Sequence, residues 1–231
     1  MLELFPGGFE ERDAGGAVEL AAYVETDDGR LRAAFGGVAV AEVADDWAER
    51  WREFHRPARV GPLWIGPPWL AAPADALAVV IDPGQAFGTG GHATTRLCLE
   101  LVLELAPGSL LDVGCGSGVL SIGAARLGFG PLTAIDDDPA AVEAATANAA
   151  ANGVAASVEL RDALAGGALP AADVTVANIA LDAVTAVASG LTSPFLVASG
   201  YLVGEDPRPR GYERVRRVSA EAWAADLYAR Q

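Results

Sequence analysis

Three glycines and one aspartate form the first group of residues in this chain with recognisable chemistry. In the stretch LDVGCGSGVLS, Gly114, Gly116 and Gly118 stand at every second position. Glycines at a turn between a strand and a helix let the backbone approach a ligand closely, and the helix start offers free N–H groups. Asp136 ends the next apolar run, where a carboxylate can accept hydrogen bonds from both ribose hydroxyls of an adenosine. The pattern predicts a nucleoside site, and the alternative is a tight turn with a helix cap.

Two nucleoside cofactors, NAD and S-adenosylmethionine, fit this pattern. The dinucleotide fingerprint is G-x-G-x-x-G, whereas the third glycine here comes one residue earlier. Asn178 ends the run VTVAN, at the edge of the expected sheet where ligands bind. Its amide carbonyl can accept a hydrogen bond from an amine, which favours the second cofactor. The alternative for Asn178 is a polar cap at the end of a strand.

A second glycine-rich stretch, DPGQAFGTGGHATT, precedes the first one along the chain. Gly88, Gly90 and Gly91 allow a loop that wraps around a ligand. Thr95 offers a hydroxyl group near the start of a helix. His92, judged without its neighbours, is better explained as a packed or capping histidine than as a ligand contact.

The elements that must position these residues alternate between strands and helices. Their hydrophobic periodicity and turn signals place strands at residues 77–82, 109–114, 132–136, 157–162 and 173–178, and helices at 92–105, 117–128 and 138–153. In the last helix, Asp138 is the expected cap, Pro139 the first residue and Gly153 the residue past the end. This alternation predicts an α/β fold with a doubly wound, Rossmann-like, mostly parallel sheet.

The part of the chain before this alternation has a different composition. Residues 1–44 are expected to form a small α/β appendage, and residues 45–75 a tryptophan-rich helix and linker before the main domain at 76–231. Four of the five tryptophans lie here: Trp47, Trp51, Trp64 and Trp69. They either pack the linker against the main domain or form a face for a partner.

Charge and composition exclude several functions. The formal net charge is −15 at pH 7, and all sixteen basic residues are arginine. Without lysine there is no P-loop lysine, Schiff base or pyridoxal phosphate anchor. The negative charge repels bare nucleic acid and anionic membranes, and suits a basic protein partner or simply solubility. The two cysteines and two histidines lack metal-ligand spacing, so no metal is expected.

Targeting signals are also missing from the sequence. The acidic start MLELFPGGFEERD does not have the pattern of a signal peptide. No apolar run approaches the roughly 20 residues that span a bilayer. We therefore expect a cytoplasmic protein that does not act at a membrane.

Taken in order and spacing, the motifs resemble those of the ribosomal protein L11 methyltransferase family. The similar stretches are IDPGQAFGTGGHATTRLCLELV, LLDVGCGSGVLSIGAARLG, AIDDDPAAVEAATANAAANGV and VANI. The linker DWAERWREFHRPARVGPLWIGPPW and the final AWAADLYAR extend the resemblance over residues 45–231. It implies a class I methyltransferase that uses S-adenosylmethionine to methylate lysine or N-terminal amines of a ribosomal protein, with no direct contact to nucleic acid.

The resemblance also implies roles for single residues. The first glycine-rich loop would fold over the methionine end of the cofactor, and the second would hold the adenosine. Residue by residue, it assigns cofactor contacts to Thr95, Gly114, Gly116, Asp136 and Asn178, with Phe87, Gly88 and His92 lining the same pocket. Asn178 would also orient the attacking amine, without a dedicated general base. Asp162 would either reach the adenine amino group or cap a helix.

Two departures from the family bear on the methyl acceptor. Only residues 1–44 precede the linker, and they resemble a truncated form of the ferredoxin-like domain that grips the substrate. The segment after Asn178 is also shorter than usual. The alternatives are therefore a methyltransferase for another protein lysine or a small amine, an NAD-dependent oxidoreductase, or an inactive binding module.

Overall fold

The computed structural model describes four segments of the chain: residues 10–13, 18–21, 56–82 and 90–231. The chain divides into two compact units, Met1–Glu49 and Arg50–Gln231. In the first unit, strands β1 (Glu10–Asp13) and β2 (Val18–Ala21) pair antiparallel. The tryptophan-bearing helix expected before residue 56, as well as Phe87 and Gly88, lies outside the described residues.

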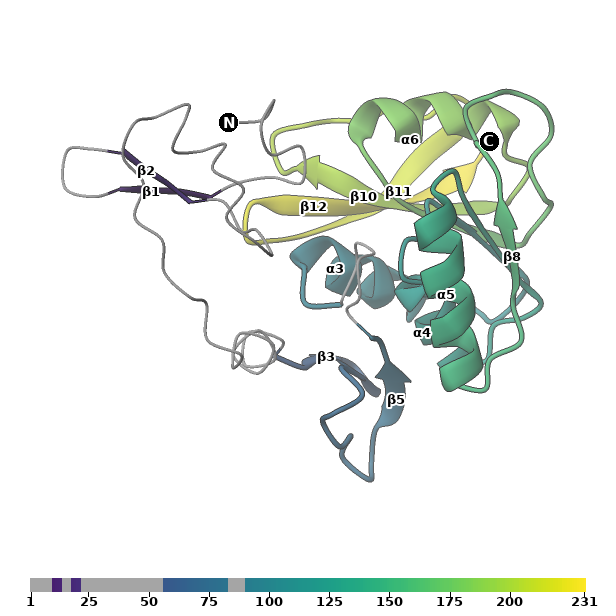
Figure 1. The fold of residues 1–231 in the computed structure, drawn as a ribbon. Helices are drawn as coiled ribbons and strands as arrows, with labels where there is room; N and C mark the ends of the chain where they lie inside the picture. Colours follow the sequence, from purple (N-terminus) through teal and green to yellow (C-terminus); the bar gives the residue numbers. More distant parts are fainter. Residues whose placement is uncertain (1–9, 14–17, 22–55, 83–89) are drawn as a thin grey trace. The chain divides into compact units, whose positions relative to one another are not determined.

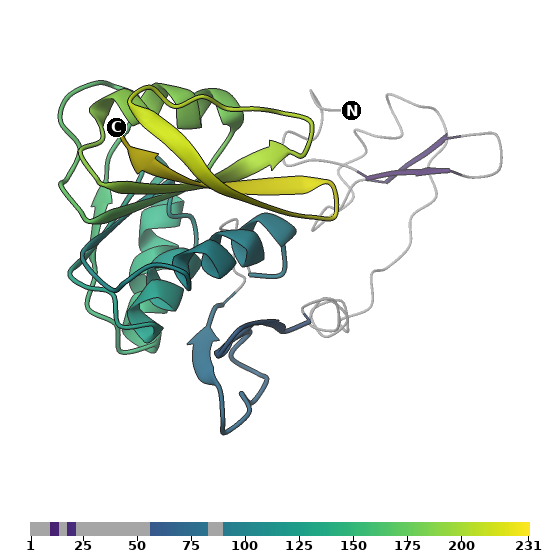
Figure 2. The same cartoon turned by 180° about the vertical axis from the view of Figure 1, so that it is seen from behind.

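The second unit contains a seven-stranded sheet with the strand order β11-β12-β10-β9-β6-β7-β8 (Figure 1). Its strands are β6 (Leu110–Val113), β7 (Leu132–Asp136), β8 (Ser157–Leu160), β9 (Val174–Asn178), β10 (Phe195–Leu202), β11 (Tyr212–Ala220) and β12 (Trp223–Arg230). The five strands from β8 to β10 are parallel, and β12 runs antiparallel to both of its neighbours. Figure 2 shows the long β11–β12 hairpin from the other side.

The strand order reverses at the centre of this sheet. From β6 the chain adds β7 and then β8 on one side, and it returns to add β9 and β10 on the other. Ligands of open α/β sheets bind at the carboxyl ends of the strands on either side of such a reversal. The prediction of a doubly wound sheet is confirmed, and β6 and β9 flank the expected ligand crevice.

Helices cover the two faces of the sheet unequally. Figure 1 shows α3 (Ala93–Val102), α4 (Val119–Arg126) and α5 (Pro139–Ala151) on one face and α6 (Leu181–Val187) on the other. A short 3-10 helix, η1 (Ala188–Gly190), continues α6. Neighbouring residues of β6 point to opposite faces, so Leu110 packs in the cluster with α3 and α4 and Leu111 in the cluster with α6. The central strands β6 and β9 are therefore buried on both sides, as their apolar sequences require.

Helix α5 begins and ends where the sequence predicts. The Asp138 side chain accepts a hydrogen bond of 2.9 Å from the Ala140 N–H, and Pro139 is the first helical residue. At the other end Gly153 adopts φ +64°, a left-handed conformation that glycine tolerates at little cost. Both ends are defined by residues close in sequence.

A separate three-stranded sheet contains β3 (Ala58–Val60), β4 (Leu63–Gly66) and β5 (Leu77–Val80). β4 pairs antiparallel with β3 and parallel with β5, so the expectation that the 77–82 strand belongs to the main sheet was wrong. All four residues of β4 are buried, and Trp64 is only 6% exposed. For Trp64 this favours packing over partner binding. The division into three domains at residues 44 and 75 stays a prediction.

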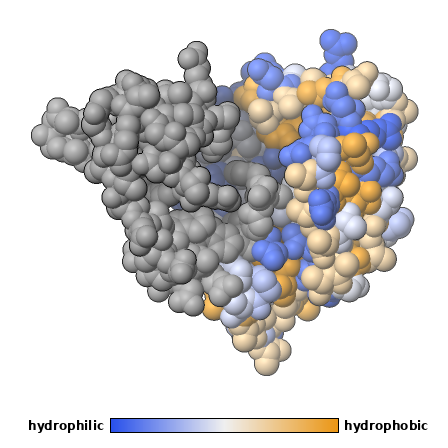
Figure 3. All heavy atoms as spheres, viewed as in Figure 1, coloured by the Kyte–Doolittle hydropathy of each residue, from blue (hydrophilic) through white to orange (hydrophobic). Residues whose placement is uncertain are grey.

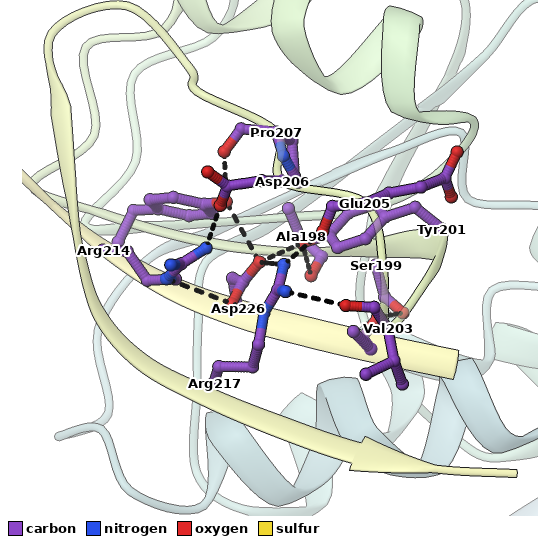
Figure 4. Close-up of polar contacts among 12 residues, drawn as sticks. Ala198, Ser199, Tyr201, Val203, Glu205, Asp206, Pro207, Arg214, Arg217 and Asp226 are labelled. Carbon is purple, nitrogen blue, oxygen red and sulfur yellow. Dashed lines mark hydrogen bonds and ion pairs between the residues drawn. The ribbon is translucent and has the colours of Figure 1, made fainter. Parts of the chain in front are cut away.

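The connection between β10 and β11, residues 203–211, contains no helix and lies beside the buried carboxylate of Asp226 (Figure 4). Asp226 is fully buried and receives two hydrogen bonds of 2.8 Å from the Arg217 guanidinium. The hydroxyls of Tyr201 and Tyr228 lie 2.9 Å and 3.1 Å from the same carboxylate. Hydrogen bonds from Arg217 and Tyr228 also reach main-chain carbonyls of Val203, Glu205 and Pro207. Side chains thus hold this connection in place.

The surface of the second unit mixes polar and apolar residues. On the face in Figure 3, hydrophilic and hydrophobic residues alternate over short distances. Among the described residues, no helix is both long enough and apolar enough to cross a membrane.

Candidate functional site

The glycine turn after β6 adopts backbone conformations that only glycine takes readily. Gly114, Gly116 and Gly118 have φ values of +69°, +52° and +79°. A Cβ atom on Gly114 would lie 2.4 Å from Cγ2 of Ile179, the residue that follows β9. The N–H group of Gly114 also donates to the Ile135 carbonyl over 2.9 Å. The turn is therefore fixed between the ends of β7 and β9.

Asp136 is held beside this turn by two main-chain N–H groups. Its Oδ2 atom accepts from the Gly116 N–H at 2.9 Å, and its Oδ1 atom accepts from the Asp138 N–H at 3.0 Å. The residue is partly exposed. A carboxylate has about four lone-pair sites, so each oxygen retains capacity to accept from a ligand hydroxyl. The structure thus brings together Asp136 and Gly116, two residues that the sequence predicted for one nucleoside site.

Asn178, the last residue of β9, contacts the start of α3 through its side chain. Its Nδ2 atom donates to Oγ1 of Thr94 over 3.2 Å, and the same Oγ1 lies 2.8 Å from Nδ1 of His92. The Thr94 N–H also points to Nδ1 of His92, at 3.4 Å, and His92 is the N-cap of α3. Nδ1 therefore acts as an acceptor, so the Thr94 hydroxyl donates to it and accepts from Asn178. This chain of hydrogen bonds fixes the amide of Asn178 and leaves its carbonyl oxygen directed away from Thr94.

The imidazole of His92 packs against Trp223 at the start of β12. The two ring centroids are 5.0 Å apart and the ring planes are inclined by 68°, an edge-to-face arrangement. One turn further along α3, Arg96 forms an ion pair of 2.5 Å with Glu221 in the β11–β12 turn. The hairpin end therefore lies against the start of α3, beside Asn178.

Sequence reasoning missed Thr94 and Trp223. Thr94 stands in the Thr-Thr pair from which the resemblance selected Thr95, and its position in that pair was the only available signal. Trp223 carried no local signal, because its contact with His92 depends on how β12 and α3 pack.

Thr95 and Asp112 each contain a buried oxygen atom that has no hydrogen-bond partner among the described residues. Thr95 is fully buried, and its Oγ1 atom has no hydrogen-bond partner in the part of the chain that the structure describes. The same holds for Oδ1 of Asp112, whereas its Oδ2 accepts from the Ser121 N–H and hydroxyl. Burial raises the pKa of Asp112 to about 6. Unpaired buried polar atoms in a folded protein call for an explanation, and a ligand is one.

The remaining predicted residues are placed as follows. Oδ1 of Asp162 accepts from the Leu164 N–H at 2.7 Å, which is a turn rather than a helix cap, and its contact with adenine stays a prediction. Gly90 adopts φ +85°, and a Cβ atom there would lie 2.3 Å from Cγ2 of Ile65 in β4. The end of the first glycine-rich loop thus packs against the three-stranded sheet.

Within the described segments, no group of three or more His, Cys, Asp or Glu residues could hold a metal ion.

Comparison with known families agrees with this arrangement. The family model of ribosomal protein L11 methyltransferase (PrmA) matches residues 10–204. The chain belongs to this family. The match includes both glycine-rich stretches, Asp136 and Asn178, and it confirms the family predicted from the motifs.

Curated relatives are longer than this chain. The ribosomal protein L11 methyltransferase of Symbiobacterium thermophilum is 40% identical over 194 residues, which cover 81% of this chain and 62% of that protein. The enzyme of the same name from Pelobacter propionicus is 39% identical over 211 residues, covering 81% of this chain and 67% of the relative. This chain therefore spans about two thirds of the length of these two relatives.

Solved structures show the same fold. The ribosomal protein L11 methylase from Lactobacillus delbrueckii subsp. bulgaricus superposes with a TM-score of 0.64 at 30% identity, covering 74% of this chain and 96% of that chain. A putative RNA methyltransferase from Pyrococcus horikoshii, at 16% identity and a TM-score of 0.51, shares the fold alone. One fold hosts many functions, so the methyl acceptor must be inferred from the site.

Proposed function

We propose that this chain is an S-adenosylmethionine-dependent N-methyltransferase that methylates lysine or N-terminal amines of ribosomal protein L11. The observation that carries the proposal is the fixed amide of Asn178, held by Thr94 at the sheet edge that also presents Asp136. A nucleoside at Asp136 and an amine at Asn178 would meet across the ends of β6 and β9. Family membership supports both halves of this assignment.

The residues present fit the cofactor. Asp136 would accept hydrogen bonds from the ribose hydroxyls, and the glycine turn would allow the adenosine to approach the backbone. The buried Thr95 hydroxyl, which has no partner among the described residues, would gain one from the ligand. When bound, the cofactor supplies a methyl group already activated on a sulfonium. The glycine spacing disfavours a dinucleotide in the same place.

The contribution of the protein is mainly to position the acceptor. Positioning of two reactants in a productive geometry can account for several kcal/mol of a barrier. The carbonyl oxygen of Asn178 would accept an N–H of the neutral amine and aim its lone pair at the methyl group. A lysine amine has a pKa near 10.4 in water, and a dry site beside a positive sulfonium favours its neutral form. The methylated amine then releases a proton, and water accepts it without a dedicated base.

Thr94 and His92 would keep the Asn178 amide in this orientation. Since Nδ1 of His92 accepts from the Thr94 main chain and hydroxyl, the direction of each hydrogen bond in the chain is set. Asn178 then cannot rotate its amide without losing the bond to Thr94. The arrangement favours an acceptor group toward the substrate, as an attacking amine requires.

The charge of the chain suits the proposed substrate. A net charge of −15 attracts a basic ribosomal protein and raises the rate of encounter at low salt. A ribosomal substrate also implies action in the cytoplasm.

The test is incubation of the purified chain with ribosomal protein L11 and labelled S-adenosylmethionine, followed by mass spectrometry. We expect label on lysine or N-terminal amines, and loss of label with Asn178→Ala. Transfer to a different protein or to a small amine in a cell extract, with L11 unlabelled, would replace the substrate assignment. Calorimetry showing tight NAD binding and none of S-adenosylmethionine would overturn the reaction class.

A further inference from the structure

A single buried asparagine on α5 joins the glycine turn to the strand segment that leads into the first glycine-rich loop. Asn148 is 4% exposed. Its Nδ2 atom donates to the Ser117 carbonyl over 2.9 Å, and its Oδ1 atom accepts from the Asp82 N–H over 3.0 Å. The amide group of Asn148 thus donates to the glycine turn and accepts from the segment at Asp82.

One helical turn later, Asn152 contacts only one of these segments. Its Oδ1 atom accepts from the Val80 N–H at 2.9 Å, and its Nδ2 atom donates to the Val80 carbonyl at 2.6 Å. Arg126 adds a hydrogen bond of 2.7 Å from Nε to the Ala78 carbonyl. These contacts bind the edge of β5 that does not pair with β4. Asn152 therefore resembles Asn148 in chemistry and location, but it has no bond to the glycine turn.

The glycine turn also packs closely on α5 beside Asn148. A Cβ atom on Gly118 would lie 3.2 Å from both Cα and Cβ of Ala145, which is three residues before Asn148 on the same helix. From the other side, Asp136 accepts from the Gly116 N–H. The hydrogen bond from Asn148 holds the carbonyl of the Ser117–Gly118 peptide, whose N–H group donates to the Cys115 carbonyl over 2.8 Å.

We propose that Asn148 is a positioning residue for the nucleoside site, which keeps the glycine turn in its ligand-ready shape before the cofactor binds. The inference rests on the proposed function. A turn that is already ordered loses less conformational entropy when the ligand binds, so it binds the ligand with higher affinity than a disordered turn would. Asn148 itself contacts residues of the site rather than the ligand. Loss of its bond to Ser117 should weaken cofactor binding about tenfold, in line with the net worth of a buried hydrogen bond.

The experiment compares Asn148→Ala with Asn152→Ala in the full chain. Asn148→Ala removes one side-chain bond to the end of the β5 segment and one to the glycine turn, whereas Asn152→Ala removes two bonds to Val80 in β5. Both variants should therefore lower the melting temperature. Only Asn148→Ala should weaken S-adenosylmethionine binding about tenfold by calorimetry, and raise KM for the cofactor while kcat at saturation stays nearly unchanged. Asn148→Ser, which cannot span both partners, should show the same split if the alanine variant folds poorly.

Hydrogen exchange supplies a readout independent of turnover. The amides of residues 114–118 should exchange faster in Asn148→Ala and at the original rate in Asn152→Ala. Equal affinities and equal exchange in the two variants would overturn the inference alone. Failure of the unmodified chain to bind S-adenosylmethionine would overturn the proposed function and the inference with it.

Discussion

Substitution of Gly200 by alanine should displace the backbone next to Asn178. Gly200 lies in β10, where the pairing with β12 shifts between Ser199 and Tyr201, and it adopts φ +106°. A Cβ atom there would lie 2.2 Å from the carbonyl oxygen of Ile179 and 2.7 Å from its carbonyl carbon. Both are main-chain atoms, so no side-chain rotation can relieve the collision.

Two separable penalties make up the expected loss of stability. A side chain at such a positive φ is strained by about 1–3 kcal/mol, and overpacking against a fixed neighbour adds about 1–3 kcal/mol. Gly211→Ala is the matched control, because Gly211 has φ +82° and a Cβ atom there would have nothing within 4 Å. The control should show only the first penalty, so Gly200→Ala should be less stable by about 1–3 kcal/mol.

Urea unfolding measures the stability difference, and steady-state kinetics measures its effect on the site. If the midpoints shift with unchanged slopes, the difference in unfolding free energy follows directly. Because Ile179 follows Asn178, Gly200→Ala should also lower kcat by up to about 100-fold, the effect of misplacing a reacting group by an ångström. Gly211→Ala should leave kcat unchanged. Equal stability of the two variants, or unaltered kcat in Gly200→Ala, would refute the reasoning.

Three further outcomes follow from the site. Asp136→Ala should weaken S-adenosylmethionine binding at least tenfold, since a charged hydrogen-bond acceptor is lost, and unchanged calorimetric affinity would remove Asp136 from the site. Asn178→Ala and Thr94→Val should lower kcat more than they change cofactor affinity, and full turnover in either would contradict the positioning role. Burial raises the pKa of Asp112 from 3.8 to about 6 on folding, so the folded state binds this proton more tightly. Stability should therefore fall by up to about 3 kcal/mol as pH rises from about 4 to 6. Asp112→Asn should lack this component in unfolding titrations, and an unchanged pH dependence would disprove the assignment.

Elements defined by local chemistry were predictable from the sequence. The cap Asp138, Pro139 and Gly153 delimit α5 within a few residues of its ends. β4 was missed, because the Gly and Pro residues on both sides of Leu63–Gly66 suggested a linker and concealed a fully buried strand. β5 was recognised as a strand but assigned to the wrong sheet, because the choice of a pairing partner depends on distant residues rather than on periodicity.

The same distinction applies to the candidate site. Gly116, Asp136 and Asn178 were predictable because each stands at the carboxyl end of a parallel strand or directly after one, and these ends meet at one edge. Trp223 and its contact with His92 were not, since they depend on a hairpin folding back onto α3. Asn148 was not predicted, because its role depends on the packing of α5 against the glycine turn.

Among the described residues, no strand pairs with the outer edge of β11, which has a consequence for contacts between copies of this chain. An exposed outer strand with a regular backbone invites another sheet to pair with it and so promotes aggregation. In β11 the register shifts between Arg214 and Arg216, and the intervening Val215 is 62% exposed. Arg216 also forms an ion pair of 2.7 Å with Glu104. This irregular, charged strand is therefore a poor template for strand addition.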